Sequence, residues 1–211
     1  MIHLIETTHA GSVPASELPD WALSHGVTSL STAEVMHLCG LPANQVSQRM
    51  ASLRKGGKLF SPARGLWVPI PPEYRTWGAP DPMGYIDDMM AHLGAGYLVG
   101  WLTAAERHGA SHHAAQVFQV ATDKTVRARA FGRSRLEFYA RSYVGSATQS
   151  AELLRNTGVC VASPGATMLM LAADPGMCGG MSNVANLVIE LAEEHLDFEA
   201  EATTDAPLFP D

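Results

Sequence analysis

The sequence predicts an α+β protein with an N-terminal winged helix-turn-helix domain and a mixed α/β domain after it. Three observations support this fold class. Apolar residues recur at helical spacing between residues 31 and 55, and they alternate like strand residues between 58 and 69. From residue 83 onward, helical patterns give way to strand patterns and then to helical patterns again. Such grouping favours an α+β architecture over a doubly wound parallel sheet.

The composition is typical of a globular protein and disfavours several other classes. The chain has 211 residues, of which 46% are hydrophobic, and a net charge of −7, which suits one or two buried cores. No apolar run reaches the ~18–20 residues that span a bilayer, and residues 1–17 lack the basic and apolar blocks of a secretory signal. The three cysteines, Cys39, Cys160 and Cys178, have no CxxC spacing, so we expect free thiols and no metal. We also expect no other cofactor, no membrane contact and a cytoplasmic location.

The winged domain is expected to begin with a short helix at residues 19–25, after an arm at residues 1–15. Ser16, or the pair Ser16-Glu17, is expected to cap this helix, and Gly26 to end it. Its core side chains are predicted to be Trp21 with Leu23 or Leu18.

A second helix is expected from Ser31 to Gly40, because Ser31 and Glu34 form a capping-box pattern. Val35 and Leu38 share its apolar face. Pro42 suits the first turn of a third helix, which ends at Gly56-Gly57. The apolar face of the third helix is predicted to consist of Val46, Met50 and Leu53.

The opposite face of the third helix is predicted to carry polar side chains and one arginine. Asparagine and glutamine pair with adenine and arginine pairs with guanine, so this set is typical of a helix that reads base edges. The residues concerned are Asn44, Gln45, Ser47, Gln48, Arg49 and Ser52.

A hairpin is expected next, with strands at 58–61 and 65–69 and a turn at Pro62-Ala63-Arg64 that places Arg64 at the tip of a wing. Residues 49–68 contain five basic residues and no acid: Arg49, Arg54, Lys55, Lys58 and Arg64. A basic region in an acidic chain indicates phosphate binding. The alternative is a helical hairpin and strand pair used only for protein contacts.

Residues 72–82 are rich in proline and show no periodicity, which predicts a linker. We place the domain boundary near Gly78, so that residues 1–78 form the DNA-binding domain and residues 79–211 form an α+β domain with an acidic tail. Seven acids and no Lys or Arg lie within residues 193–211. The tail is either solvated or a docking segment, for which Leu196, Phe198, Leu208 and Phe209 would be the apolar anchors.

Periodicity assigns the elements of the second domain. Two helices are expected at 83–93, with Ile86, Met89, Met90 and Leu93 inward, and at 97–108, with Leu98, Trp101, Leu102 and Ala105 inward. Strands are expected at 116–122, 126–131, 136–143 and 159–162. A helix at 167–173, a loop at 176–180 and a last helix capped by Ser182 follow.

Six cations lie within 18 residues of the second domain, at Lys124, Arg127, Arg129, Arg133, Arg135 and Arg141. On strands, Arg127 and Arg129 would share one face, and so would Arg133 and Arg135. The first five are our candidate partner-binding or second basic surface, for DNA backbone or for an acidic partner. The alternative is a solvated sheet face that is protected against edge pairing.

The second domain resembles one family. Tyr97-Leu98 followed by Ala104-Ala105-Glu106-Arg107-His108-Gly109 is similar to a helix motif of AbiEi-family antitoxins. The strand at 116–122, the segment 159–173 and the Gly179-Gly180…Asn183-Val184 entry to the last helix also fit that family, in the same order. The resemblance covers roughly residues 28–195. It departs from the family at Met170, where an acidic residue is common, so no polar role carries over to that position.

The resemblance implies an antitoxin that represses its own operon through the winged domain. Its partners would be operator DNA containing an inverted repeat, read by a monomer or a weak homodimer, and a cognate nucleotidyltransferase-like toxin. The alternative is a winged-helix transcriptional regulator with a ligand-sensing C-terminal domain. We expect no enzyme, because the residues offer no convincing catalytic constellation. His112-His113 has no further metal ligands nearby, and Asp87 and Asp88 point in different directions on a helix. Ser163 and Thr167 have no recognisable base that would activate them as nucleophiles. His108 suits the C-terminal cap of a helix.

Overall fold

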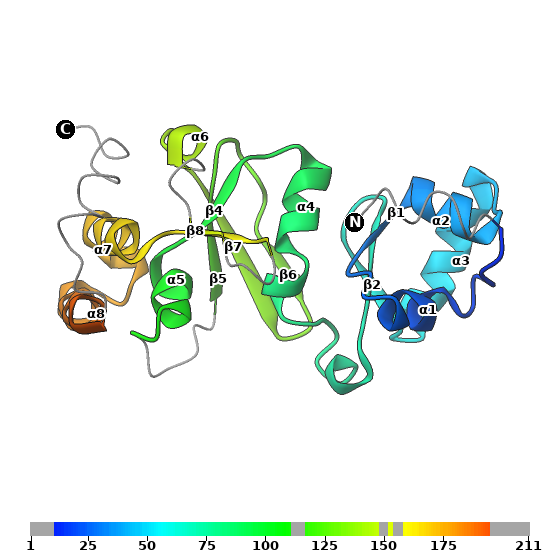
Figure 1. The fold of residues 1–211 in the computed structure, drawn as a ribbon, viewed down its shortest axis with the longest axis horizontal. Coiled ribbons are helices and arrows are strands. Elements are labelled where there is room, and N and C mark those ends of the chain that lie inside the picture. The colour runs from blue at the N-terminus through cyan, green and yellow to red at the C-terminus, as the bar shows by residue number, and fades with distance from the viewer. Residues whose placement is uncertain (1–10, 111–116, 148–151, 154–157, 195–211) are drawn as a thin grey trace. The chain divides into compact units, whose positions relative to one another are not determined.

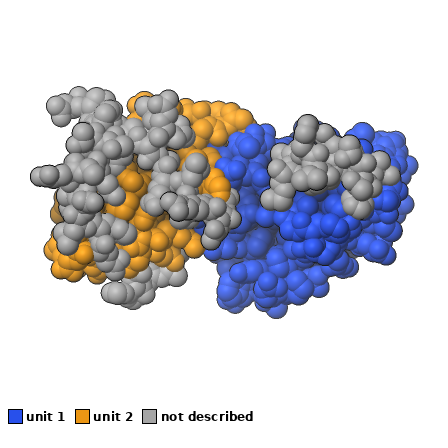
Figure 2. Space-filling view, viewed as in Figure 1, with its two compact units in different colours: residues 1–93, 131–133 blue, residues 94–130, 134–211 orange. Residues whose placement is uncertain are grey.

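The structure is a computed structural model of the chain, and it describes residues 11–110, 117–147, 152–153 and 158–194 (Figure 1). The chain forms two compact units, one of residues 1–93 with 131–133 and one of residues 94–130 with 134–211 (Figure 2). The described residues form α-helices, a three-stranded sheet and a six-stranded sheet, so the chain is a mixed α+β protein as predicted. Among the described residues, no helix has both the length and the apolar character that a membrane span requires.

The first unit contains three helices and a small antiparallel sheet, followed by a fourth helix. The elements are α1 (Leu18–Ser24), β1 (Leu30–Ser31), α2 (Thr32–Cys39), α3 (Ala43–Lys55), β2 (Leu59–Ala63), β3 (Leu66–Pro69), the 3-10 turns η2 (Pro72–Tyr74) and η3 (Pro82–Gly84), and α4 (Ile86–Leu93). β3 lies between β1 and β2. Apolar residues of α1, α2 and α3 pack with β1 and β2 in one core that includes Leu18, Ala22, Leu30, Val35, Leu38, Val46, Met50 and Leu59.

The start and end of α2 follow the predicted signals. The Ser31 hydroxyl accepts a hydrogen bond from the Glu34 backbone N–H at 3.2 Å, and the Glu34 carboxylate accepts one from the Ser31 N–H at 2.6 Å. These two bonds satisfy N–H groups that have no partner within the helix. Gly40 ends the helix with a left-handed φ of 62°. The predicted capping box is therefore confirmed.

Other boundaries differ from the prediction by short distances. The N-cap of α1 is Glu17, the second residue of the predicted Ser16-Glu17 pair, and Pro42 lies before the first turn of α3 rather than in it. Within the predicted arm, residues 1–10 lie outside the described residues. Gly11 and Val13 donate backbone hydrogen bonds to the carbonyls of His37 and Leu38. These carbonyls belong to the last turn of α2 and need partners from outside the helix, so this part of the arm is packed.

The hairpin has a shorter turn than predicted. Pro62 and Ala63 belong to β2, Ala63 pairs with Leu66, and only Arg64-Gly65 form the turn. Between Phe60 and Ala63 the register is irregular. Proline cannot donate to the ladder, which explains an irregularity at this position in a strand at the edge of the sheet.

Most of the predicted linker is exposed, and within residues 72–82 the buried side chains are Ala79 and Pro82. Ile70, before the linker, donates a backbone hydrogen bond to Lys58, and Met83, after it, is buried. The compact units divide at Leu93, so residues 79–93 belong to the first unit. Tyr85 contributes to this packing, since its ring lies 5.1 Å from that of Phe60. A boundary between separately folding domains near Gly78 stays a prediction.

The second unit is built on the six-stranded sheet, in the order β6-β7-β5-β4-β9-β8. Its elements are β4 (Tyr97–Val99), α5 (Trp101–Arg107), β5 (Val117–Thr122), β6 (Arg129–Phe131), β7 (Ser134–Ala140), α6 (Val144–Ala147), β8 (Glu152–Leu153), β9 (Cys160–Val161), α7 (Pro164–Ala173), the 3-10 turn η4 (Pro175–Met177) and α8 (Met181–Glu194). β4 is antiparallel to β5 and parallel to β9, and β5 is parallel to β7. α5 packs against β5, α7 against α5, and α8 against α7 (Figure 1).

The predicted helix at 97–108 is wrong in its first part. Tyr97–Val99 form the central strand β4, and the helix begins only at Trp101. Gly100 separates them in an extended conformation and donates its N–H to the Gln119 carbonyl. A Cβ at this position would lie 2.1 Å from the methyl carbon of Met170, so any larger residue would require the Met170 side chain to move.

Smaller differences affect the remaining elements. The third predicted strand starts at Ser134, and the helix predicted at 167 begins at Pro164, because the Ser163 hydroxyl caps it by accepting from the Ala166 N–H. The strand predicted from residue 126 is formed only from Arg129. Ser182 lies inside α8 and does not cap it.

Candidate functional sites

The polar side chains predicted on α3 are exposed. The helix has 13 residues and no acid, and Val46 and Met50 on its other side are fully buried. Its core contacts therefore orient the helix so that a continuous polar and basic surface faces solvent. The exposed residues are Asn44, Gln45, Ser47, Gln48, Arg49, Ser52, Arg54 and Lys55.

These residues do not form a single face. Each residue of an α-helix is rotated by about 100° from the one before, so Asn44, Gln48 and Lys55 lie opposite the buried stripe. Arg49 follows Val46 by three positions and precedes Leu53 by four, which places it beside that stripe. Arg49 was predicted on the opposite face with these residues, but the helical geometry places it beside the buried stripe.

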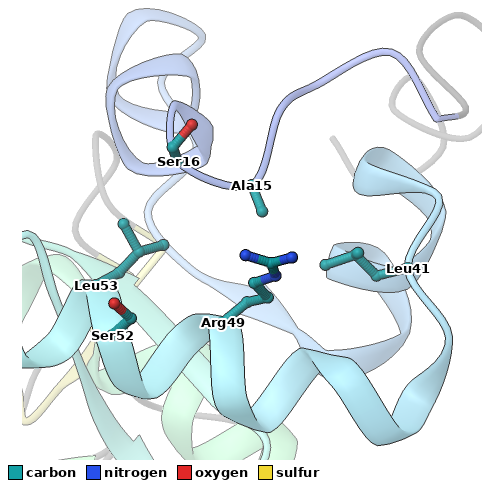
Figure 3. A pocket seen from close by; sticks show the side chains of 6 residues that line it. All are labelled: Ala15, Ser16, Leu41, Arg49, Ser52 and Leu53. Carbon is teal, nitrogen blue, oxygen red and sulfur yellow. The ribbon is translucent and has the colours of Figure 1, made fainter.

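Arg49 lies in a hollow of about 320 Å³ (Figure 3). Its guanidinium group points from α3 toward Ala15, between Leu41 and Leu53. Ser16 and Ser52 complete the lining. Among the residues that the structure describes, no carboxylate forms an ion pair with Arg49. The hollow therefore combines an arginine with apolar walls and small side chains.

The hairpin turn presents Arg64 while its backbone is held. The Arg64 side chain is exposed, and its carbonyl accepts a hydrogen bond from His92 Nε2 at 3.0 Å. The Gly65 carbonyl accepts one from the Thr32 N–H at 2.9 Å. Lys58 is half-buried and forms an ion pair with Asp20 at 3.2 Å. Of the two hairpin cations, Arg64 is therefore the better placed to meet an external anion.

The second basic set is divided by the fold. Arg133 belongs to the first compact unit, where its guanidinium lies 5.7 Å from the centre of the Trp77 ring. The remaining members belong to the second unit, where Lys124 donates to the Gly94 carbonyl at 2.6 Å and Arg135 pairs with Glu137 at 2.6 Å. Arg127 is exposed but precedes β6, so the prediction that Arg127 and Arg129 share a strand face is wrong.

A cluster around Trp101 was missed by the sequence analysis. Trp101 is fully buried and has a φ of 50°, the only positive φ among the described residues other than glycine. Its indole N–H donates to Asp174 at 3.3 Å, and Arg141 donates to the same carboxylate oxygen at 2.8 Å. The Tyr139 ring lies 5.2 Å from the Trp101 ring. The hydrogen bond to Asp174 raises the pKa of Arg141, so this guanidinium keeps its charge.

The Gln119 side chain connects the start of α5 with the 3-10 turn η4. Its side chain is buried, its carbonyl oxygen accepts from the Leu102 N–H at 2.9 Å, and its amide donates to the Met177 carbonyl at 3.2 Å. Gly100 has no side chain that could cap α5, and Gln119 satisfies one of the open N–H groups instead. The available sequence signal was a glutamine between the apolar residues Phe118 and Val120 of a strand.

His108 caps the C-terminal end of α5 as predicted, and its imidazole contacts a carbonyl outside that helix. It occupies the C-cap position of α5, but its Nε2 atom donates to the Ala162 carbonyl at 2.7 Å. The Thr167 hydroxyl donates to the same carbonyl at 3.3 Å. Both side chains therefore join α5 and α7 to the end of β9, which is a structural role.

Residues considered for catalysis or metal binding have structural surroundings. Burial and the nearby Asp174 charge raise the pKa of Cys178 to about 11, so its thiol is protonated at neutral pH and is a poor nucleophile. Asp88 accepts a hydrogen bond from Thr28 at 2.7 Å. Across residues 11–110, 117–147, 152–153 and 158–194, no three metal-binding side chains converge. His112-His113 lies outside the described residues.

Comparisons with known proteins connect the second unit to a family. A family model described as the AbiEi antitoxin C-terminal domain matches residues 97–206, starting at the first residue of β4. The chain is also similar to a solved structure, that of the RV2827C protein from Mycobacterium tuberculosis. The two share 17% sequence identity and a TM-score of 0.64, over 91% of this chain and 71% of that one, which is a likeness of fold. No curated protein matches the chain.

Proposed function

The chain belongs to the AbiEi antitoxin family, and from this we propose that it is the antitoxin and transcriptional autorepressor of a toxin–antitoxin operon. The family implies a toxin partner. In the proposed function that toxin is nucleotidyltransferase-like, and the protein binds operator DNA with an inverted repeat, as a monomer or a weak homodimer, in the cytoplasm. The proposal assigns DNA binding to the first unit and toxin neutralisation to the second.

The exposed, acid-free surface of α3 carries the DNA-binding half of the proposal. We interpret α1, α2, α3 and the β1-β3-β2 sheet as a winged helix-turn-helix, with α3 as the recognition helix and Arg64 at the wing tip. Asparagine, glutamine and arginine on α3 supply base and phosphate donors, and the turn supplies a further cation. The net charge of −7 favours binding confined to this region and sensitive to salt.

We assign toxin binding to the second basic set. In the second unit, Arg127 and Arg135 are exposed cations, and a nucleotidyltransferase holds its metal with carboxylates. Opposite charges would bring the two proteins together and fix their orientation. Lys124 and Arg129 complete the proposed partner surface of the second unit, although each also has a local contact or partial burial.

The test separates the two functions with paired variants of the full chain. Arg49→Ala with Arg64→Ala should abolish binding to the DNA upstream of the gene and leave rescue of cells that express the neighbouring toxin intact. Arg127→Ala with Arg135→Ala should weaken rescue and leave DNA binding unchanged. Binding would be measured by fluorescence anisotropy, rescue by growth, and folding by circular dichroism. Loss of rescue in the first folded variant would contradict the division into two modules.

A further inference from the structure

We infer that the hollow around Arg49 binds a backbone phosphate of DNA, and that Arg49 is a phosphate-binding rather than a base-reading residue. This inference rests on the proposed DNA-binding function and specifies one contact within it. It changes the role that the sequence suggested, because guanine recognition was expected for the arginine of α3.

The position of Arg49 on α3 is the first argument. A recognition helix enters the groove with the face opposite its core, which here consists of Asn44, Gln48 and Lys55. Arg49 projects to one side of the buried stripe, toward Ala15. Side chains at the flank of such a helix meet the groove wall, where the sugar-phosphate backbone runs.

The chemistry of the hollow is the second argument. A guanidinium group binds two phosphate oxygens through parallel N–H donors, and Arg49 presents this group in the hollow. Leu41 and Leu53 form apolar walls on either side of the guanidinium. A volume of about 320 Å³ leaves room for a phosphodiester and its neighbouring sugar atoms.

The electrostatic setting is the third argument. Arg49 is exposed and forms no ion pair with a carboxylate of the described residues, and α3 contains no acid. The nearest cations along the chain, Arg54 and Lys55, are exposed as well. Lys58, in contrast, is paired with Asp20. The charge of Arg49 is therefore available to a phosphate without first breaking an internal ion pair.

The experiment compares Arg49→Gln with Gln48→Ala in the full chain. Affinities are measured over a range of salt concentrations for the upstream duplex and for an unrelated duplex of equal length. Arg49→Gln should weaken binding to both duplexes by the same factor, about tenfold. It should also reduce the slope of log K against log salt by about one. Gln48→Ala should instead reduce the ratio between the two duplexes and leave the slope unchanged.

A second arm identifies the phosphate. Single methylphosphonate substitutions remove the charge of one phosphate at a time from the upstream duplex. At one position, the substitution should weaken binding of the wild type by about the factor lost in Arg49→Gln, and it should have little effect on Arg49→Gln itself. This result would assign the anion to DNA rather than to a free ion.

Two outcomes would overturn the inference while leaving the proposed function in place. In the first, Arg49→Gln alters the preference between duplexes without changing the salt slope, which is the behaviour of a base contact. In the second, every methylphosphonate affects wild type and Arg49→Gln equally. A wild-type protein that binds neither duplex would overturn both the proposed function and this inference.

Discussion

Trp101 is the residue at which side-chain packing and backbone conformation conflict most clearly. Its φ of 50° is unfavourable for a bulky residue and costs on the order of 1–3 kcal/mol. The conformation persists because the indole is fully buried, donates to Asp174 and packs against Tyr139. Packing of the side chain therefore compensates for an unfavourable backbone at the junction between β4 and α5.

At position 101, glycine should give a more stable protein than alanine, which reverses the usual order of their stabilities in a helix. Both Trp101→Ala and Trp101→Gly lose the buried indole, which costs about 3–5 kcal/mol. Glycine tolerates the positive φ, so Trp101→Gly should be more stable than Trp101→Ala by about 1 kcal/mol in urea unfolding. Ala104→Gly in α5 is the matched control, where glycine should be the less stable residue. An alanine variant more stable than the glycine variant at position 101 would refute this account.

Cys178 allows a test of the electrostatics around Asp174. Because its pKa is raised to about 11, little thiolate forms at pH 8, and the thiolate is the reactive species. In the native protein, iodoacetamide should modify Cys178 much more slowly at pH 8 than in the urea-unfolded protein, because the thiol is fully buried and its pKa is raised. Asp174→Asn removes the neighbouring negative charge, lowers the thiol pKa and should speed labelling at pH 8. Mass spectrometry would follow the reaction, and equal rates in native and urea-unfolded protein would contradict the prediction.

At the scale of single elements, local signals located α2 and α3 well. Ser31, Glu34 and Gly40 define one helix, and the spacing of Val46 and Met50 orients the next. Hydrogen bonds within one or two turns determine these features, so sequence alone was sufficient. The exposed polar surface of α3 followed from the same periodicity, except for the sideways position of Arg49.

Long-range pairing explains what the sequence did not reveal. Tyr97-Leu98-Val99 form a strand because β5 and β9 pair with them, and an apolar run that continues into a helix does not display those partners. Asp174 is 73 positions from Trp101, and Met177 is 58 positions from Gln119. Contacts at such separations depend on the tertiary fold, so the Trp101 cluster could not be predicted from local patterns.

The capping box gives a prediction for α2. Ser31→Ala removes the hydroxyl that accepts from Glu34 N–H and should lower the free energy of unfolding by about 1 kcal/mol. Ser31→Asp should restore most of this loss, since aspartate is also a favoured N-cap residue. Ser47→Ala, on the exposed surface of α3, is the matched control and should change stability little. Chemical denaturation measures all three, and an effect of Ser31→Ala no larger than that of Ser47→Ala would count against the capping role.

At the scale of the whole molecule, two compact units with separate buried residues should unfold in more than one step. Calorimetry of the full chain is expected to resolve two transitions. Ser31→Ala should lower the midpoint of one, and Asp174→Ala, which removes the partner of Arg141 and Trp101, should lower the midpoint of the other. A single transition that both variants shift alike would show that the units unfold as one.

The strand order also has a consequence for synthesis on the ribosome. β4 lies at the middle of the six-stranded sheet, yet its partner β9 is translated about sixty residues later, with Val99 opposite Val161. Until Val161 leaves the exit tunnel, the nascent chain holds a central strand with one open edge, which is a template for aggregation. Chains truncated before β9 should therefore depend on chaperones or be degraded, and the antitoxin would reach its working amount only as fast as complete chains are released.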